Sequence, residues 1–349
     1  MPNMLWLVLC LVPALTYAQT CPATTSSPWR LSTSNRLVTF GDSYTDESRL
    51  QYMIDHDGKV PPLGTQLPES PLLRNWARRV AVNTGIELRN YAVSGAVCSN
   101  HITPRPFPPI RGNFPSVLEY EIPAYLEESL AAGEEGAVST VFALMVGTND
   151  LGNIGFVTDS QVDGKVLRDY TRCLFEAFDQ LYASGARSFL LFNTAPLHLA
   201  PQFADDDHGG QEATQYWPDK PSNRTQIARK MEQQTTSVNE ILRFQVSYEM
   251  LVAGRYPGAH IALFDTWQLL TEIYTNPTAY LNGSMPAKVS DYEHHCDVSG
   301  ENCAYEYNHT SPDSFMWWDE LHPSEQVHRV IAREVVETLE GRSQYAAYW

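Results

Sequence analysis

The sequence predicts an α/β protein in three layers, α/β/α, in which helices cover both faces of a mostly parallel five-stranded sheet. Two observations predict this class. Short apolar runs recur along the chain, and longer segments with helical periodicity separate them. The apolar runs also lack strict polar alternation, as expected for strands that are buried on both faces of a parallel sheet. Strands that alternate with helices in this way pair in parallel and bury the sheet under the helices.

Five strands and five helices are expected, and they alternate along the chain. Ser116 and Glu119 form a candidate capping box for the second helix, and Pro123 must start or kink that helix because proline disrupts a helix interior. Ligands of such sheets bind at the carboxyl ends of strands, so the residues after each strand are candidates for a site. The strands are expected at Arg36–Phe40, Leu88–Val93, Thr140–Val146, Ser188–Asn193 and His260–Asp265, and the helices at Leu72–Asn83, Ser116–Ala132, Ser160–Ser184, Arg224–Val252 and Glu325–Glu340.

Residues 1–18 are expected to form a signal peptide, and residues 19–349 a single domain. The stretch from Met4 to Tyr17 is apolar, uncharged and too short to span a membrane comfortably, and small side chains at Thr16 and Ala18 suit a signal peptidase. A membrane anchor is the alternative for this stretch. No later segment is long and apolar enough to span a bilayer. We therefore expect a soluble, secreted, extracellular protein without stable membrane association.

The cysteines agree with an oxidising compartment. One of the six lies in the expected signal peptide, so an odd number remains in the mature chain. Cys296 and Cys303 are expected to form a disulfide that closes a short loop. Pairing Cys21 with Cys98 would then leave Cys173 as a free thiol, although the sequence does not determine the connectivity.

Three N-glycosylation sequons also agree with secretion. They make Asn223, Asn282 and Asn308 candidate glycosylation sites. Each such triplet also arises by chance, so none of them is decisive alone.

The charge and composition exclude several classes of partner. The chain carries 41 acidic and 24 basic side chains, for a formal net charge of −17. Nucleic acid and anionic lipid both need a basic surface, so neither is an expected partner. The apolar fraction of 43% suits a packed globular domain rather than a disordered chain. We expect a monomer that binds a small-molecule or oligosaccharide ester.

Two polar clusters resemble metal sites, but we expect neither to bind a metal. The run from Asp205 to His208 is interpreted as a solvated loop. His294, His295 and Cys296 lie beside Cys303, and the secreted context favours a disulfide over a zinc site. The chemistry predicted below needs no metal and no cofactor.

Four short motifs lie where such a sheet builds a site. Taken singly, each has a structural explanation: Gly41-Asp42-Ser43 as a turn, Gly95 as a close-packing glycine, Asn149 as a helix cap, and the segment from Asp319 to His322 as a surface turn before a helix. Three of the motifs follow predicted strands and the fourth precedes the last helix. They are FGDSY at 40–44, YAVSGA at 91–96, VGTND at 146–150 and WDELHP at 318–323.

Together, the order and spacing of the four motifs resemble the SGNH or GDSL hydrolase superfamily, which takes its name from Ser, Gly, Asn and His residues of this kind. The resemblance extends from Val38 to Val335. It is strongest to the fungal acetylesterases of carbohydrate esterase family sixteen. The segments that carry it are FGDSYTDESRL, NYAVSGAVCSN, PSVLEYEIPAYL and FMWWDELHPSEQ.

The residue types in these motifs suit nucleophilic catalysis. A serine hydroxyl needs a base to remove its proton, which makes Ser43 the candidate nucleophile and His322 the candidate base. Asp319, three residues earlier, can orient the imidazole and stabilise its cation. The resemblance implies the same three roles, and it implies an oxyanion hole built from the backbone N–H groups of Ser43 and Gly95 and the side-chain amide of Asn149.

We therefore expect a secreted serine esterase that hydrolyses O-acetyl esters through an acyl-enzyme, and the resemblance favours hemicellulose-derived oligosaccharides as substrates. Tyr44, Trp317 and Trp318 could stack on sugar rings, although aromatic side chains also line cores and lipid pockets. One alternative is a lipase or phospholipase that acts on longer acyl chains. A further alternative is a secreted carbohydrate-binding protein that keeps these residues without catalysis.

Overall fold

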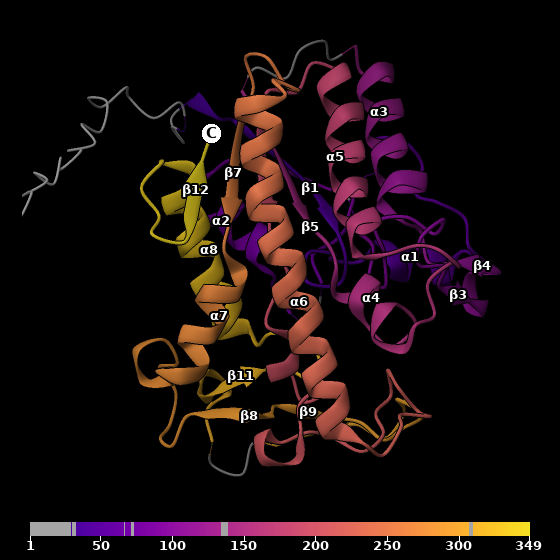
Figure 1. The fold of residues 1–349 in the computed structure, drawn as a ribbon, viewed down its shortest axis with the longest axis vertical. Helices are drawn as coiled ribbons and strands as arrows, with labels where there is room; N and C mark the ends of the chain where they lie inside the picture. The colour runs from indigo at the N-terminus through magenta and orange to yellow at the C-terminus, as the bar shows by residue number, and fades with distance from the viewer. Residues whose placement is uncertain (1–28, 30–32, 66, 71–72, 134–138, 307–309) are drawn as a thin grey trace, which may run out of the picture.

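The computed structural model describes residues 29, 33–65, 67–70, 73–133, 139–306 and 310–349 (Figure 1). The expected signal peptide lies outside this part of the chain. A six-stranded sheet forms the centre of the fold. Its strands are β1 (Arg36–Gly41), β2 (Glu87–Asn90), β5 (Thr140–Met145), β6 (Ser188–Phe192), β7 (His260–Phe264) and β12 (Ala346–Tyr348).

The strand order explains where a site can form. The order is β12-β7-β6-β5-β1-β2, and all the pairs are parallel except β12 with β7. The chain runs outward from β1 to β2 and then returns to place β5 on the other side of β1. Carboxyl ends of strands at such a reversal flank a crevice in which open α/β sheets bind ligands. The ends of β1 and β5 are therefore the favoured place for a site.

The sheet is mostly parallel, as predicted, and has one strand more than the five expected. The additional strand β12 has only three residues, too few for a periodic pattern. Trp349, the residue after β12, is held to β7 by two backbone hydrogen bonds. Trp349 N donates to Ile261 O at 2.9 Å, and Ile261 N donates to Trp349 O at 3.1 Å. β2 ends at Asn90, before the predicted end at Val93, although the chain still runs beside β1 there, since Val93 N donates to Gly41 O at 2.9 Å.

Eight α-helices accompany the sheet in the described part of the chain. Helices α3, α5 and α6 cover one face of the sheet, and α2 and α8 pack together on the other (Figure 1). Among the described residues, none of the helices could span a lipid bilayer, because none combines the required length with sufficient apolar character. The helices are α1 (Arg49–Asp55), α2 (Trp76–Thr84), α3 (Ile122–Ala131), α4 (Thr148–Leu151), α5 (Leu167–Ala183), α6 (Arg224–Ser247), α7 (Thr266–Thr275) and α8 (Glu325–Leu339).

Two helices begin later than predicted because of their capping interactions. Asn75 Oδ1 accepts a hydrogen bond from Arg78 N at 3.1 Å at the start of α2. Asp169 Oδ2 accepts one from Val166 N at 2.9 Å at the start of α5. Side chains that satisfy the free N–H groups of the first turn set the beginning of a helix. Helices α1, α4 and α7, which follow β1, β5 and β7 in the chain, were not predicted.

The segment predicted as the second helix begins with a π-helical turn and continues as an α-helix. Residues Val117–Glu121 form a π-helical turn that leads into α3, where Pro123 occupies the second position, as a proline near a helix start can. The capping box was wrong. The Ser116 hydroxyl donates to the Glu119 carboxylate itself, so this serine does not cap the backbone.

Three small two-stranded sheets lie outside the central one. A hairpin joins β3 (Pro106–Phe107) to β4 (Gly112–Asn113). The strands β8 (Lys288–Tyr292) and β11 (Phe315–Trp317) pair in parallel, and β9 (His294–His295) pairs with β10 (Ala304–Tyr305). The last two of these sheets lie below the central sheet in Figure 1.

Two disulfides link the described cysteines. Cys296 pairs with Cys303, as predicted. Cys98 pairs with Cys173, which corrects both the expected bridge from Cys98 to Cys21 and the expected free thiol at Cys173. The loop after β2 and the buried face of α5 bring Cys98 and Cys173 together with their Cα atoms 6.2 Å apart, and both side chains are fully buried. Cys21 lies outside the described residues.

Candidate active site

The turn after β1 places Ser43 at the end of the sheet. β1 ends at Gly41, whose φ is +136°, and a Cβ atom there would overlap the carbonyl group of Met145 on β5. Only glycine permits this close approach of two backbones. Asp42 Oδ1 accepts a hydrogen bond from Tyr44 N at 3.1 Å, which closes the turn around Ser43. The packing of β1 on β5 thus determines the position of the serine.

Ser43, His322 and Asp319 form a continuous chain of polar contacts. Ser43 Oγ lies 2.8 Å from His322 Nε2, although the two residues are 279 positions apart. His322 Nδ1 lies 2.8 Å from Asp319 Oδ2 and 2.9 Å from Asp319 Oδ1. When Nδ1 carries the ring proton and donates to the carboxylate, Nε2 is free to accept the proton of Ser43. This arrangement can deprotonate a serine hydroxyl.

Asp319 is buried and yet suited to remain ionised. Burial by itself raises the pKa of this carboxyl group, but the charge of His322 and hydrogen bonds from His322 and from the backbone outweigh burial, so its pKa is lowered. The backbone donors are Leu321 N at 2.8 Å and His322 N at 2.7 Å, both to Oδ1. The tight turn between the aspartate and the histidine therefore supplies two of the donors that hold the negative charge.

The same pair raises the basicity of His322. Burial acts to lower the pKa of the imidazole, but the charge of Asp319 and its hydrogen bond dominate, so the pKa is raised above its usual value. A raised pKa means that the protein stabilises the imidazolium form. That is the form a general base adopts after it has taken the proton of Ser43.

Two tyrosines contact this pair or the turn that carries it. Tyr216 donates its hydroxyl hydrogen bond to Asp319 Oδ2 at 2.8 Å, and its ring meets the His322 ring edge-to-face at 5.4 Å. Tyr44 donates to Leu321 O at 2.8 Å, within the turn that carries the histidine. Both tyrosines restrict the movement of the imidazole.

A cavity of about 410 Å³ contains Ser43 and His322 together with Gly95 and Asn149. Gly95 has a φ of +84°, and a Cβ atom there would overlap the ring of Phe114. The N–H groups of Ser43 and Gly95 make no hydrogen bond to another described residue. Asn149 is the second residue of α4, which follows β5, and its Nδ2 donates to Ala96 O at 2.8 Å. The residues predicted for the oxyanion hole are thus gathered around the predicted nucleophile.

The cavity also contains residues that the sequence did not single out. Its wall includes the aromatic rings of Phe107, Phe114, Phe203 and Tyr216 and the side chain of Arg105. Phe107 and Phe114 belong to the hairpin around β3 and β4 and stack with centroids 4.1 Å apart. These side chains come from segments without a recognisable motif. Only the tertiary fold brings them to the nucleophile.

Comparison with known proteins identifies the family. A family model described as GDSL-like lipase/acylhydrolase matches residues 37–335, which is most of the chain. The chain belongs to this family. This GDSL-family protein is therefore a carboxylic ester hydrolase.

Named relatives of this GDSL hydrolase include two fungal proteins. It is 38% identical to an acetylesterase of Hypocrea jecorina over 320 aligned residues. These residues cover 90% of this chain and 91% of the relative. It is 23% identical over 341 residues to an acetylesterase of Thermothelomyces thermophilus, which covers 94% and 96%. Among solved structures, a catalytic mutant of an acetylxylan esterase from Geobacillus stearothermophilus matches with a TM-score of 0.42 at 15% identity, over 88% of this chain and 94% of that chain.

Two of the three aromatic residues considered for sugar stacking, Tyr44 and Trp317, cannot stack on a sugar in this GDSL hydrolase. Tyr44 is 1% exposed and Trp317 is fully buried, so neither ring offers a free face. Trp318 is partly exposed, and its ring stacks on His294 at 5.1 Å. The aromatic wall of the cavity comes instead from the residues named above.

The two clusters that resembled metal sites have other bonding partners. Asp205 caps a short 3₁₀ turn by accepting from His208 N at 3.1 Å. The sulfur atoms near His294 are joined in the Cys296–Cys303 disulfide, so they are not thiolate ligands. A neighbouring group of Asp291, His295 and Glu306 surrounds Lys288, whose Nζ lies 2.9 Å from Asp291 Oδ2 and 3.1 Å from Glu306 Oε1.

Two of the three sequon asparagines are on the surface. Asn223 and Asn282 are exposed, and Asn223 caps α6 through Oδ1, which accepts from Gln226 N at 3.0 Å. Its Nδ2, the atom that carries a glycan, is not needed for that cap. Asn308 lies outside the described residues.

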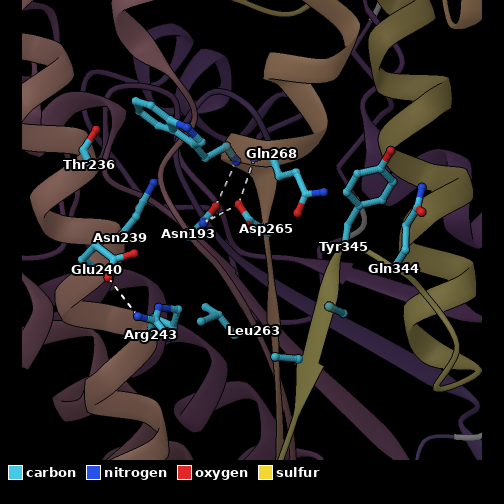
Figure 2. Close-up of a pocket in the computed structure, with 13 residues that line it drawn as sticks. Asn193, Thr236, Asn239, Glu240, Arg243, Leu263, Asp265, Gln268, Gln344 and Tyr345 are labelled. Atoms are coloured by element: carbon cyan, nitrogen blue, oxygen red, sulfur yellow. Dashed lines mark hydrogen bonds and ion pairs between the residues drawn. The ribbon is translucent and has the colours of Figure 1, made fainter.

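A second cavity, of about 280 Å³, lies at the carboxyl ends of β6 and β7 (Figure 2). Asn193 Nδ2 donates to Asp265 Oδ1 at 2.8 Å at its centre, and the same oxygen caps α7 by accepting from Gln268 N at 2.9 Å. Glu240 and Arg243 form an ion pair at 3.0 Å on its wall. Its described lining includes none of Ser43, His322 and Asp319.

Proposed function

We propose that this GDSL hydrolase is an acetylesterase that uses Ser43, His322 and Asp319 as a catalytic triad. The observation that carries the proposal is the unbroken path of contacts from Ser43 Oγ through the imidazole to the buried carboxylate, with a distance of 2.8 Å at each step. Ser43 and His322 line a cavity that is large enough for a small ester. The proposal also rests on the relationship to an acetylesterase that is 38% identical.

Acylation follows from these contacts. Ser43 Oγ attacks the carbonyl carbon of the ester while its proton passes to His322 Nε2. The carbonyl oxygen becomes an oxyanion, which the N–H groups of Ser43 and Gly95 and Nδ2 of Asn149 stabilise. The bond from the carbonyl carbon to the alkoxy oxygen then breaks, and His322 gives its proton to the leaving alcohol. Acetyl-Ser43 remains.

Deacylation repeats the same steps with water as the nucleophile. Water gives a proton to His322 Nε2 and attacks the carbonyl carbon of acetyl-Ser43. The oxyanion occupies the same donors. The bond between the carbonyl carbon and Ser43 Oγ then breaks, acetic acid leaves, and Ser43 Oγ takes the proton back from the imidazole. Asp319 keeps its charge throughout and stabilises the imidazolium at each stage.

We infer that the natural substrates are O-acetyl groups on hemicellulose-derived oligosaccharides. The cavity combines aromatic rings, which can stack on sugars, with polar side chains such as Asn153 and Gln215, which can bond hydroxyl groups. We also propose that the enzyme is secreted after removal of residues 1–18, acts as a monomer and carries glycans at its sequons. The two disulfides support an extracellular location.

Acetate release from acetylated xylo-oligosaccharides tests the proposal. The wild-type enzyme should release acetate, and Ser43→Ala should release none above the uncatalysed rate. Release by Ser43→Ala at the wild-type rate would exclude the proposed nucleophile. A secreted carbohydrate-binding protein without catalysis would instead fail to react with a fluorophosphonate at Ser43.

The acyl specificity needs a separate experiment. Aryl esters from acetyl to octanoyl should show kcat/KM falling as the acyl chain lengthens. A larger kcat/KM for octanoyl than for acetyl would replace the acetylesterase with the lipase or phospholipase alternative. The same Ser43→Ala variant is the control for every ester in the series.

A further inference from the structure

We propose that Arg105 is a positioning residue for the oxyanion hole, which holds Asn149 so that its Nδ2 rather than its Oδ1 faces the substrate carbonyl. The inference rests on the proposed esterase function, because the orientation of this amide matters only when an oxyanion forms. Arg105 lines the same cavity as Ser43, although it belongs to none of the four motifs.

One guanidinium nitrogen contacts both segments that supply the hole. Arg105 Nη1 donates to Asn149 Oδ1 at 2.8 Å and to Gly95 O at 2.8 Å. Asn149 follows β5, and Gly95 follows β2, so these segments are distant in sequence. The proposed oxyanion donors come from Ser43 and from these two segments. Arg105 thus joins the segment of Gly95 to the segment of Asn149.

The contacts of Asn149 determine which way its amide points. Oδ1 accepts from the guanidinium and Nδ2 donates to Ala96 O at 2.8 Å. A rotation of the amide by half a turn would set Nδ2 against the N–H donors of Arg105 and Oδ1 against the carbonyl of Ala96. Both contacts would then be repulsive, because arginine has no acceptor and a carbonyl has no donor. The amide is therefore held with one N–H on Ala96 and its second N–H available to the substrate.

Arg105 is itself held firmly in place. Its backbone O accepts from Phe114 N at 2.9 Å, and its backbone N donates to Asn100 Oδ1 at 3.1 Å. Its guanidinium carbon lies 4.8 Å from the centre of the Phe114 ring. A planar guanidinium stacked on a ring and bonded at one edge loses little further freedom when it fixes a partner. The hairpin of β3 and β4 therefore delivers this side chain to Asn149 in one orientation.

The charge of Arg105 adds to its geometric role. Burial lowers its pKa to about 10, against the opposing effect of the Asp150 and Asp42 carboxylates, so it remains a cation at neutral pH. Its Nε is buried without a hydrogen-bond partner among the described residues. A partly buried cation bonded to Oδ1 polarises the amide and strengthens its N–H groups as donors to an anion.

The test is a double-mutant cycle on an aryl acetate with Arg105→Ala, Asn149→Ala and the double variant. Arg105→Ala should lower kcat by about 10- to 100-fold and change KM less than about threefold, because the lost interaction acts on the oxyanion. In the Asn149→Ala background, the same change should cost less than about threefold, since residues that act through one another are not additive. Arg111→Ala is the matched control: it removes an exposed arginine of the same hairpin, which pairs with Asp57, and should keep the wild-type kcat.

Two further measurements separate positioning from a structural role. Arg105→Lys should recover part of the lost kcat, and millimolar guanidinium should raise the kcat of Arg105→Ala but not that of Arg105→Ala combined with Asn149→Ala. Circular dichroism and Tm check that each variant is folded. A wild-type kcat for Arg105→Ala, or an equal loss in both backgrounds, overturns the inference. If wild type itself shows no hydrolysis that depends on Ser43, the proposed function fails instead.

Discussion

Tyr216 and His322 contact the same oxygen of Asp319. The tyrosine hydroxyl donates to Oδ2 at 2.8 Å, and His322 Nδ1 lies 2.8 Å from that atom. With two backbone N–H groups on Oδ1, the carboxylate is surrounded by donors on both oxygens. A carboxylate with this many partners is fixed in one orientation and presents a constant field to the imidazole.

Tyr216→Phe should therefore lower kcat without unfolding the enzyme. We expect a loss of about 5- to 10-fold, because one hydrogen bond to a charged group is removed while the ring contact with His322 remains. Steady-state kinetics on an aryl acetate measure the effect. Tyr256→Phe is the matched control, since the hydroxyl of Tyr256 bonds Phe175 O and Asp179 away from the cavity. An equal loss in both variants would exclude a specific role for Tyr216.

The pH profile should report the pair of Asp319 and His322. Only neutral imidazole can accept the proton of Ser43, so kcat/KM should fall as the pH drops below the pKa of His322. Burial acts to lower that pKa, but the charge and hydrogen bond of Asp319 do most to raise it above its usual value, with smaller contributions from Asp42 and Glu320. Asp319→Asn should therefore shift the acid limb of kcat/KM to lower pH and also reduce kcat by roughly 10³- to 10⁴-fold. A profile from pH 5 to 9 measures both, and an unshifted acid limb would contradict the assignment.

Buried Asp150 should make the protein less stable as the pH rises. Burial raises its pKa from 3.8 to about 7, despite hydrogen bonds from Cys98 N and Thr103 Oγ1. Because the folded-state pKa is raised, its contribution to stability is complete below pH 3.8 and is lost as the pH rises through about 7. Between pH 5 and pH 8 this loss amounts to about 3 kcal/mol.

Asp150→Asn should remove that part of the pH dependence. Urea unfolding at pH 5 and pH 8 measures the free energy of unfolding, and its difference between the two pH values should shrink in the variant. The exposed Asp55→Asn is the control and should behave as wild type. If Asp150→Asn and wild type lose the same stability between these pH values, the pKa of Asp150 is not raised.

The two disulfides should differ in their effect on stability. The Cys98–Cys173 bridge spans 75 residues and the Cys296–Cys303 bridge spans 7. Closing a longer loop removes more entropy from the unfolded chain. The expected stabilisation is about 4 kcal/mol for the longer bridge and about 2 kcal/mol for the shorter one. Replacing both cysteines of the longer bridge with Ala should therefore lower the free energy of unfolding by more than the same change in the shorter one. Peptide mapping without reduction should find Cys98 joined to Cys173, and a free thiol at Cys173 would contradict this pairing.

The parts of the site that could be predicted lie in contiguous motifs. Ser43 and Asn149 lie two and four residues after strands of the central sheet, and Asp319 and His322 share one turn. For such residues, the strand pattern together with the order of the motifs is enough to place them at one edge of the sheet. Strands β5, β6 and β7 could be predicted for a related reason, because burial on both faces gives them nearly continuous apolar runs.

The parts that could not be predicted depend on contacts between distant segments. Arg105 and Tyr216 reach the cavity from connections whose local sequence shows no period, and only packing decides where they point. The Cys98–Cys173 pairing depends on how the loop after β2 packs against α5. The number and spacing of the cysteines do not reveal that packing. Strand β12 is held by its hydrogen bonds to β7 rather than by its own composition.

The Cys296–Cys303 disulfide spans an exposed loop that precedes the segment with Asp319 and His322. A protease that cut the chain within residues 297–302 would leave Ser43 on one polypeptide and Asp319 and His322 on another. The disulfide would still tie the two pieces together across the break. A nicked enzyme should thus survive in a protease-rich environment as a two-chain molecule, and it would come apart only when unfolded under reducing conditions.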